Sequence, residues 1–269
     1  MTMKIKIVFI DVDGTLVETS KGVVAQSSID AIADLQRHGV KCVLCTGRPP
    51  IHTKAITDLI DFDARINLNG GYIEDRKGQA LFENPMSHHD FQMIWDYARA
   101  HECGLCFHFD DFSYGYHRFD KIEDFFRTHV KEGCTIIKDD PTHTRHLHNM
   151  PYNGVVVAED EQALVDFVNV TPNLRCDKIA EHVFDVFRAD NDKARAIEIL
   201  LDEFNLAWHE AAAIGDSTND LKMLELAGCG IAMGNASDYV KSHADWISDD
   251  AAHDGVAKAI WHLLENNQA

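Results

Sequence analysis

Basic residues are scarce in this chain of 269 residues, which has 25 lysines and arginines against 44 aspartates and glutamates. The formal net charge is therefore −19 at pH 7. Proteins that bind nucleic acids neutralise phosphates with lysine and arginine, so this balance argues against nucleic acid as a partner and against anionic membrane surfaces. A small phosphorylated molecule stays compatible with it, because salt screens the repulsion beyond about 8 Å and a local cation can capture the phosphate.

Long uncharged apolar segments are also missing, and no secretory signal peptide is visible. The seven cysteines are odd in number and spread through a chain too large to need disulfide staples, which favours a reducing compartment. No internal repeat or low-complexity tract is evident. We therefore expect a cytoplasmic protein without a membrane segment, as a monomer or a homodimer.

Apolar strand patterns alternate with helical patterns in both outer thirds of the chain. A helix face with apolar residues at i, i+3, i+4 and i+7 begins at Ile197. An order of alternating strands and helices predicts a parallel sheet with right-handed crossovers, and the expected fold class is α/β with a doubly wound, Rossmann-like core. In the outer thirds, the predicted strands are 5–10, 40–45, 66–68, 211–214 and 230–232. Further helices are predicted from Ser27 or Ser28 to Gly39, from an opening turn at Pro49 and Pro50 to about 60, at 220–226 and at 253–264.

The middle of the chain has a different character, with aromatic-rich helices, shorter strands and ten of the 16 histidines. We predict an inserted α+β domain over 83–187, and a core formed by 1–82 and 188–269. His143, His146 and His148 are the densest histidine cluster in it. Two interpretations of this cluster stay open, a solvated loop and a surface that contacts substrate.

Two acids stand at the end of the first apolar strand, in the segment Asp11-Val-Asp13-Gly14. Gly14 allows a sharp turn there, which places both carboxylates at the carboxyl edge of the predicted sheet, where open α/β folds bind ligands. A calcium loop that began at Asp11 would need a glutamate at its twelfth position, and that position is Gly22. The calcium-loop interpretation therefore fails.

Three further polar segments are expected at the same edge, because they follow other predicted strands or begin the helix that contains Ile197. A carboxylate among them can attack phosphorus, a second acid can protonate the leaving oxygen, and a hydroxyl and a lysine can hold the phosphoryl oxygens. Clustered carboxylates with oxygen ligands suit Mg²⁺. The three segments are Thr46-Gly47-Arg48, Lys193 and Gly215-Asp216-Ser217-Thr218-Asn219-Asp220.

This combination resembles the haloacid dehalogenase-like (HAD) phosphatases, in the Cof-type branch with a large cap domain between the second and third motifs. The resemblance covers both outer thirds closely, while the middle matches in placement and size. The third motif departs from the usual Lys-Gly, because Ala194 follows Lys193 here and Arg195 lies close by. The motifs that carry the resemblance are Asp11–Leu16, Thr46–Arg48, Asn69-Gly70, Lys193, Gly215–Asp220 and Ala232–Ala236.

The resemblance implies a role for each motif residue. Asp11 is implied as the nucleophile and a Mg²⁺ ligand. Asp13 is implied as the general acid and base, which also binds the metal through its backbone carbonyl. Thr46 is implied to hold the phosphoryl group, and Lys193 to steady the nucleophile and the phosphoryl charge.

The remaining implied roles concern the metal shell and the substrate. Asp216 completes the metal ligation, and Asp220 orients the metal shell. Gly47, Arg48 and Asn219 are implied as substrate-binding, with Asn219 near the phosphoryl group.

The expected function is a Mg²⁺-dependent phosphatase that acts on a small phosphate ester through an aspartyl-phosphate. The family suggests sugar phosphates first and phosphorylated cofactors, such as flavin mononucleotide or pyridoxal phosphate, second. Two alternatives stay open: a phosphotransferase or mutase with the same aspartyl-phosphate, and a non-catalytic sensor of a phosphorylated ligand.

Overall fold

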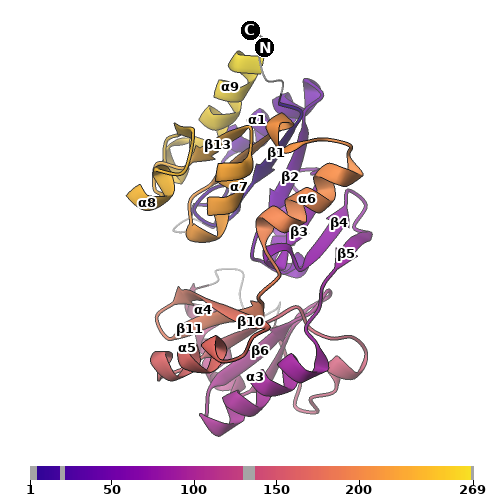
Figure 1. The fold of residues 1–269 in the computed structure, drawn as a ribbon, viewed down its shortest axis with the longest axis vertical. Helices are drawn as coiled ribbons and strands as arrows, with labels where there is room; N and C mark the ends of the chain where they lie inside the picture. Colours follow the sequence, from indigo (N-terminus) through magenta and orange to yellow (C-terminus); the bar gives the residue numbers. More distant parts are fainter. Residues whose placement is uncertain (1–4, 19–21, 130–136, 268–269) are drawn as a thin grey trace. The chain divides into compact units, whose positions relative to one another are not determined.

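The computed structural model describes residues 5–18, 22–129 and 137–267. Contacts within the chain group it into two compact units (Figure 1). Unit 1 consists of Met1–Gly47, Lys54–Phe82 and Asp192–Ala269, and unit 2 of Arg48–Thr53 and Glu83–Asn191. Among the helices in these described ranges, none is both long and apolar enough to cross a membrane.

Unit 1 is organised around an eight-stranded sheet with the order β14-β13-β12-β1-β2-β3-β4-β5. Neighbouring strands from β14 to β3 are parallel, and β4 pairs with β3 in the antiparallel direction. The strands are β1 (Ile7–Ile10), β2 (Lys41–Cys45), β3 (Ala64–Asn67), β4 (Tyr72–Asp75), β5 (Ala80–Glu83), β12 (Ala211–Gly215), β13 (Cys229–Ala232) and β14 (Trp246–Ile247). This confirms the α/β core with a parallel sheet.

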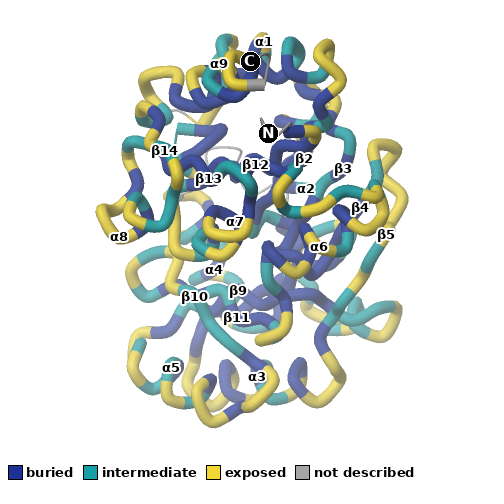
Figure 2. The backbone as a smooth tube through the Cα atoms, turned by 45° about the horizontal axis from the view of Figure 1, so that its top comes forward, coloured by how far each residue is buried: buried dark blue, intermediate teal, exposed yellow. Residues whose placement is uncertain are grey.

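Helices cover both faces of this sheet, because its central strands are apolar on both sides. Successive residues alternate between two cores: Val8 and Ile10 of β1 belong to one, and Ile7 and Phe9 to the other. Such near-continuous apolar runs are typical of parallel strands buried on both faces, and Figure 2 shows these strands as buried. The helices are α1 (Gln26–Arg37), α2 (Pro50–Thr57) and α9 (Gly255–Asn267) on the first core, and α6 (Lys193–Glu203), α7 (Leu221–Leu226) and α8 (Asp238–Lys241) on the second.

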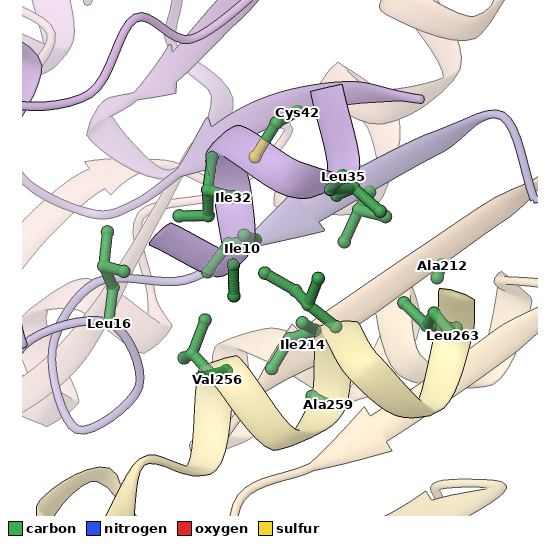
Figure 3. Packing of buried hydrophobic residues seen from close by; sticks show 14 of the residues in the cluster. Ile10, Leu16, Ile32, Leu35, Cys42, Ala212, Ile214, Val256, Ala259 and Leu263 are labelled. Carbon is green, nitrogen blue, oxygen red and sulfur yellow. The ribbon is translucent and has the colours of Figure 1, made fainter. Parts of the chain in front are cut away.

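Helices α1 and α9 pack side by side on the first face. Ile32 and Leu35 of α1 and Val256 of α9 converge there on Ile10 and Ile214 (Figure 3). All five side chains are almost fully buried. Each contributes about 1.5–3 kcal/mol of apolar burial, which stabilises the packing of the two helices on β1 and β12.

Unit 2 has a six-stranded sheet with the order β10-β11-β9-β6-β7-β8, antiparallel except for the parallel pair β7–β8. Helices α3 and α5 contribute to the core on one face of it, and α4 contributes to the core on the other. The elements are α3 (His88–Ala100), β6 (Gly104–His108), β7 (Ser113–His117), α4 (Phe119–His129), β8 (Ile137–Asp139), β9 (Asn153–Val157), α5 (Glu161–Asn169), β10 (Leu174–Ala180) and β11 (Val183–Arg188).

The histidine cluster of unit 2 lies partly in an aromatic environment. The His146 ring stacks on Phe91 at a centroid distance of 4.6 Å, and its Nδ1 lies 3.1 Å from the hydroxyl of Tyr116. His143 stacks on Tyr116, with the centroids 5.5 Å apart, while His148 is exposed. Two of the three histidines are therefore packing residues rather than parts of a freely solvated loop.

Candidate active site

Three sequence motifs follow neighbouring parallel strands of unit 1 at their carboxyl ends. Asp11 comes directly after β1, and its backbone N–H donates to the carbonyl of Ile214 in β12 over 3.0 Å. Thr46 follows β2, which is the neighbour of β1 on the other side, and Asp216 follows β12. The parallel pairing therefore brings these residues to one edge of the sheet, as the sequence predicts.

Lys193 is the first residue of α6, and its ammonium group reaches two carboxylates. Its Nζ lies 2.6 Å from Oδ1 of Asp11 and 2.7 Å from Oδ1 of Asp220. The lysine side chain is only 1% exposed. Asp192 is the N-cap residue of this helix, because its side chain accepts hydrogen bonds from the backbone N–H groups of Ala194 and Arg195.

Arg195, the other cation near the third motif, takes a different place. Its guanidinium lies over the ring of Phe82, 5.7 Å from the centroid. Lys193 is thus the residue of this helix that the structure places among the carboxylates.

Asp220 is completely buried and organises the loop after β12. Its Oδ2 accepts hydrogen bonds from the backbone N–H groups of Asp216 and Ser217, over 3.1 Å and 3.0 Å. A β-carbon on Gly215 would lie 2.6 Å from the carboxyl carbon of Asp220, so glycine is required for this approach. One carboxylate therefore holds the loop with one oxygen and Lys193 with the other.

The carboxylate of Asp216 is held by two side chains. Thr15 donates from its hydroxyl to Oδ1 over 2.8 Å, and Asn235 lies with Nδ2 3.4 Å from Oδ2. The same Asn235 amide also donates to the carbonyl of Gly14 over 2.8 Å. The sequence places Asn235 in a segment typical of the Cof branch but gives it no role, because its partners are separated from it by 19 and 221 positions.

The cluster is rich in negative charge. Burial raises the pKa of Asp11, with Asp220 and Asp216 adding to the effect and Lys193 opposing it. Burial also raises the pKa of Asp216 to about 6. For Lys193, burial opposes the charged form, but Asp11 and Asp220 outweigh burial and the pKa is raised. Three carboxylates thus face one ammonium group.

A divalent cation fits this donor set. Asp11, Asp216 and Asp220 each offer a carboxylate oxygen, and these three oxygens lie within 4.8 Å of one another. With all three acids ionised and Lys193 charged, the cluster has a charge of 1 − 3 = −2, which a divalent ion balances. All the donors are oxygens, the ligand type that Mg²⁺ prefers. Asp220 is fully buried, and its two oxygens already accept from Lys193 and from two backbone N–H groups, whereas Asp216 is only partly buried. Asp11 and Asp216 are therefore the better direct ligands.

The remaining predicted residues surround this cluster to different degrees. Asp13 is exposed in the loop that also contains Gly14, and its charge contributes to the raised pKa of Asp216. Thr46 is buried, and its carbonyl accepts from the backbone N–H of Asn69 over 3.1 Å.

The predicted substrate-binding residues divide between the two units. The Nδ2 of Asn219 donates to Oδ1 of Asn69 over 3.1 Å within unit 1, where Gly47 also lies. Arg48 belongs to unit 2, and its guanidinium donates to the carbonyl of His52 over 3.2 Å.

Comparison with known proteins agrees with this geometry. The family model of the haloacid dehalogenase-like hydrolases matches residues 8–260. The chain belongs to this family.

Similar proteins extend over nearly the whole HAD-like chain. A 5-amino-6-(5-phospho-D-ribitylamino)uracil phosphatase of Bacillus subtilis, YcsE, is 29% identical over 97% of this chain and 96% of its own length. The pyridoxal phosphate phosphatase YbhA of Escherichia coli is 26% identical over 97% of this chain and all of its own length.

Among solved structures, a HAD-superfamily phosphatase from Bacteroides thetaiotaomicron has a TM-score of 0.86 and 28% identity. The match covers 97% of this chain and 95% of that one. The family and these relatives support the expected enzyme class, a phosphoric monoester hydrolase of the HAD-like, Cof-type group.

Proposed function

We propose that the chain is a Mg²⁺-dependent phosphatase that hydrolyses a small phosphorylated metabolite through an aspartyl-phosphate on Asp11. The observation that carries this proposal is the contact of Lys193 with both Asp11 and Asp220 beside Asp216. Burying Lys193 with Asp11 and Asp220 costs several kcal/mol per ion unless their charges are matched. A site that only bound phosphate would be lined mainly by cations, whereas this site has more carboxylates than cations.

The chemistry divides into two displacements at phosphorus. In the first, a carboxylate oxygen of Asp11 forms a bond to phosphorus, and the bond from phosphorus to the ester oxygen breaks. Asp13 supplies the proton that the leaving alcohol takes. In the second, Asp13 accepts a proton from water, the water oxygen bonds to phosphorus, and the bond to Asp11 breaks to release inorganic phosphate.

Lys193 and the loop residues provide the electrostatic part of the reaction. The ammonium group holds one oxygen of Asp11 in a fixed direction and stabilises charge on the phosphoryl oxygens. We assign Thr46, Gly47 and Asn219 to the phosphoryl group and Arg48 to the substrate. Asp11 and Asp216, with the Asp13 carbonyl, would hold Mg²⁺, with Asp220 orienting them; the ion, when bound, neutralises phosphoryl charge and acts as a Lewis acid.

Unit 2 is proposed to select the substrate, as the cap predicted over 83–187. The substrate class is a small phosphate monoester, either a sugar phosphate or a phosphorylated cofactor. The relatives named for pyridoxal phosphate and for a phosphoribitylamino-uracil support the second group.

The test is the release of inorganic phosphate from sugar phosphates, flavin mononucleotide, pyridoxal phosphate and 5-amino-6-(5-phospho-D-ribitylamino)uracil, with Mg²⁺ and with chelator. We expect phosphate release when Mg²⁺ is present and none with chelator. The Asp11→Asn variant, which removes the nucleophile at constant volume, should release no phosphate under either condition. Asp30→Asn is the matched control, because Asp30 is exposed on α1. Turnover in Asp11→Asn near the wild-type rate would contradict the proposal, and turnover only with an added acceptor alcohol would indicate a phosphotransferase.

A further inference from the structure

The short turn after β3, a 3-10 turn over Leu68–Gly70, connects three of the sequence motifs. Its Asn69 N–H donates to the carbonyl of Thr46 over 3.1 Å. A β-carbon on Gly70 would lie 2.5 Å from the carbonyl oxygen of Asp192, so the turn also packs closely against the start of α6. The side chain of Asn69 accepts from Asn219. One turn therefore contacts the segments that contain Thr46, Lys193 and Asn219.

The backbone of this turn is strained, because the non-glycine residues Leu68 and Asn69 have positive φ angles, of 55° and 51°. Asparagine enters the left-handed region more easily than most residues, whereas a leucine there is uncommon. Strain of this kind persists only where the surrounding contacts hold it in place. Asn69 is 4% exposed, and its main-chain and side-chain bonds supply such contacts.

The amide of Asn69 determines how the amide of Asn219 is oriented. Oδ1 of Asn69 accepts one N–H of Asn219, and Oδ1 of Asn219 accepts the hydroxyl of Ser217 over 2.5 Å. The second N–H of the Asn219 amide has no hydrogen-bond acceptor among the described residues. The Asn69 amide also lies close to Gly47 of the second motif, because a β-carbon on Gly47 would lie 3.2 Å from Nδ2 of Asn69.

We propose that Asn69 is a positioning residue, which fixes Asn219 so that its second amide N–H donates to an oxygen of the phosphoryl group. The proposal rests on the function proposed above, since that function places a phosphoryl group beside Asn219. Asn69 itself touches Asn219, Gly47 and the Thr46 backbone, and acts through them.

The test uses Asn69→Gly, because glycine keeps the left-handed backbone without strain and removes the side chain with its amide. Asn205→Gly is the matched control: Asn205 has a φ of 54° in an exposed loop of the same unit. Orthovanadate, which mimics the five-coordinate phosphoryl group, is titrated into each protein with Mg²⁺ by calorimetry, and KM and kcat are measured for the best ester. Thermal unfolding of each variant is recorded in parallel.

We expect vanadate affinity to fall about tenfold in Asn69→Gly and in Asn219→Ala, with KM rising by a similar factor. The double variant should lose no more than Asn219→Ala alone, because Asn69 acts through Asn219. A purely structural role would instead lower the unfolding temperature and give additive losses. Asn205→Gly should match the wild type in every measurement.

The outcomes separate this inference from the proposed function. A wild type that hydrolyses esters, with an Asn69→Gly variant that binds vanadate equally well, overturns the role of Asn69 alone. A wild type that binds vanadate but releases phosphate from no ester overturns the proposed function, and the vanadate titrations still decide on Asn69. A wild type that neither binds vanadate nor releases phosphate overturns both.

Discussion

Nζ of Lys193 lies 2.6 Å from Oδ1 of Asp11, although 182 positions separate the two residues. The lysine starts a helix, where its charge opposes the helix dipole at a cost of about 0.3–1 kcal/mol. It is also fully buried, which adds a desolvation cost. A residue that is unfavourable in both respects is retained for its partners, the carboxylates of Asp11 and Asp220.

Replacement of Lys193 by methionine tests this relationship. Methionine fills a similar volume but leaves Asp11 and Asp220 buried without their cation. We expect kcat/KM to fall by at least about 100-fold, since a donor that stabilises developing charge is lost. The free energy of unfolding without Mg²⁺ should fall by about 3–5 kcal/mol, because one partner of a buried ion pair is missing. Steady-state kinetics and urea titration measure the two effects.

Arg195→Met is the control for this prediction. Arg195 lies two positions further along the same helix, with its charge over Phe82, so its loss should leave kcat/KM within about twofold of the wild type. If Arg195→Met abolished turnover and Lys193→Met did not, Arg195 rather than Lys193 would be the functional cation of the third motif.

The candidate site was predictable where a polar site residue directly follows an apolar strand. The strands before Asp11, Thr46 and Asp216 are apolar runs, and parallel pairing brings their ends to one edge. The contacts of Asn69 and Asn235 were not predictable. Their partners are distant in the sequence, and an isolated asparagine gives no periodic signal.

The fold shows the same division between periodic and irregular segments. The hairpin of β4 and β5 was not predicted, because β5 is largely exposed and lacks an apolar run. The strand expected at 66–68 ends instead at Asn67, since Leu68 adopts a left-handed conformation. Helix α1 begins after Ala25 rather than at a serine cap, because burial of Ser28 and Ala31 against the sheet decides its position.

Gly14→Ala should weaken Mg²⁺ binding much more than it lowers the stability of the fold. A β-carbon at this position would lie 2.4 Å from Oδ2 of Asp216, so the carboxylate must move. The residue also has a φ of 80°, which costs a non-glycine residue about 1 kcal/mol. We expect the Mg²⁺ concentration for half-maximal activity to rise at least tenfold, as measured by titrating Mg²⁺ into the assay.

Gly39→Ala separates the two causes. Gly39 has nearly the same φ, 78°, but an added β-carbon would meet no atom within 4 Å. Both variants should therefore lose similar backbone stability, and only Gly14→Ala should lose Mg²⁺ affinity. Equal Mg²⁺ titrations in the two variants would show that the position of Asp216 does not depend on Gly14.

Unit 2 is expected to be sensitive to acid because of a buried pair of histidines, His108 and the His52 of its segment Arg48–Thr53. His108 Nδ1 lies 2.5 Å from the hydroxyl of Ser113, and that hydroxyl lies 3.1 Å from Nε2 of His52. Burial lowers the pKa of His108 to about 3 and that of His52 well below its usual value. The His108 imidazole is therefore neutral in the folded protein at any pH well above 3, and burial disfavours the charged form of His52 in the same way.

The sign of the pH effect follows from these directions. Well above pH 6.5 the histidines are neutral in both the folded and the unfolded chain, so they add no pH dependence there. As the pH falls from 6.5 toward 3, these histidines bind protons in the unfolded chain but not in the folded chain. The free energy of unfolding therefore decreases. Between pH 6.5 and 5 the loss from His108 reaches about 2 kcal/mol, and His52 adds a loss in the same direction.

Urea unfolding at pH 7 and pH 5 measures this loss in the wild type and in the double variant His52→Gln, His108→Gln. Glutamine keeps neutral donors and acceptors beside Ser113 and cannot be protonated in this range. We expect the double variant to lose much less stability than the wild type between the two pH values. His38→Gln, at an exposed position after α1, should behave as the wild type does. An equal loss in the wild type and the double variant would place the acid sensitivity in other groups, because the buried imidazoles would then take up protons without unfolding.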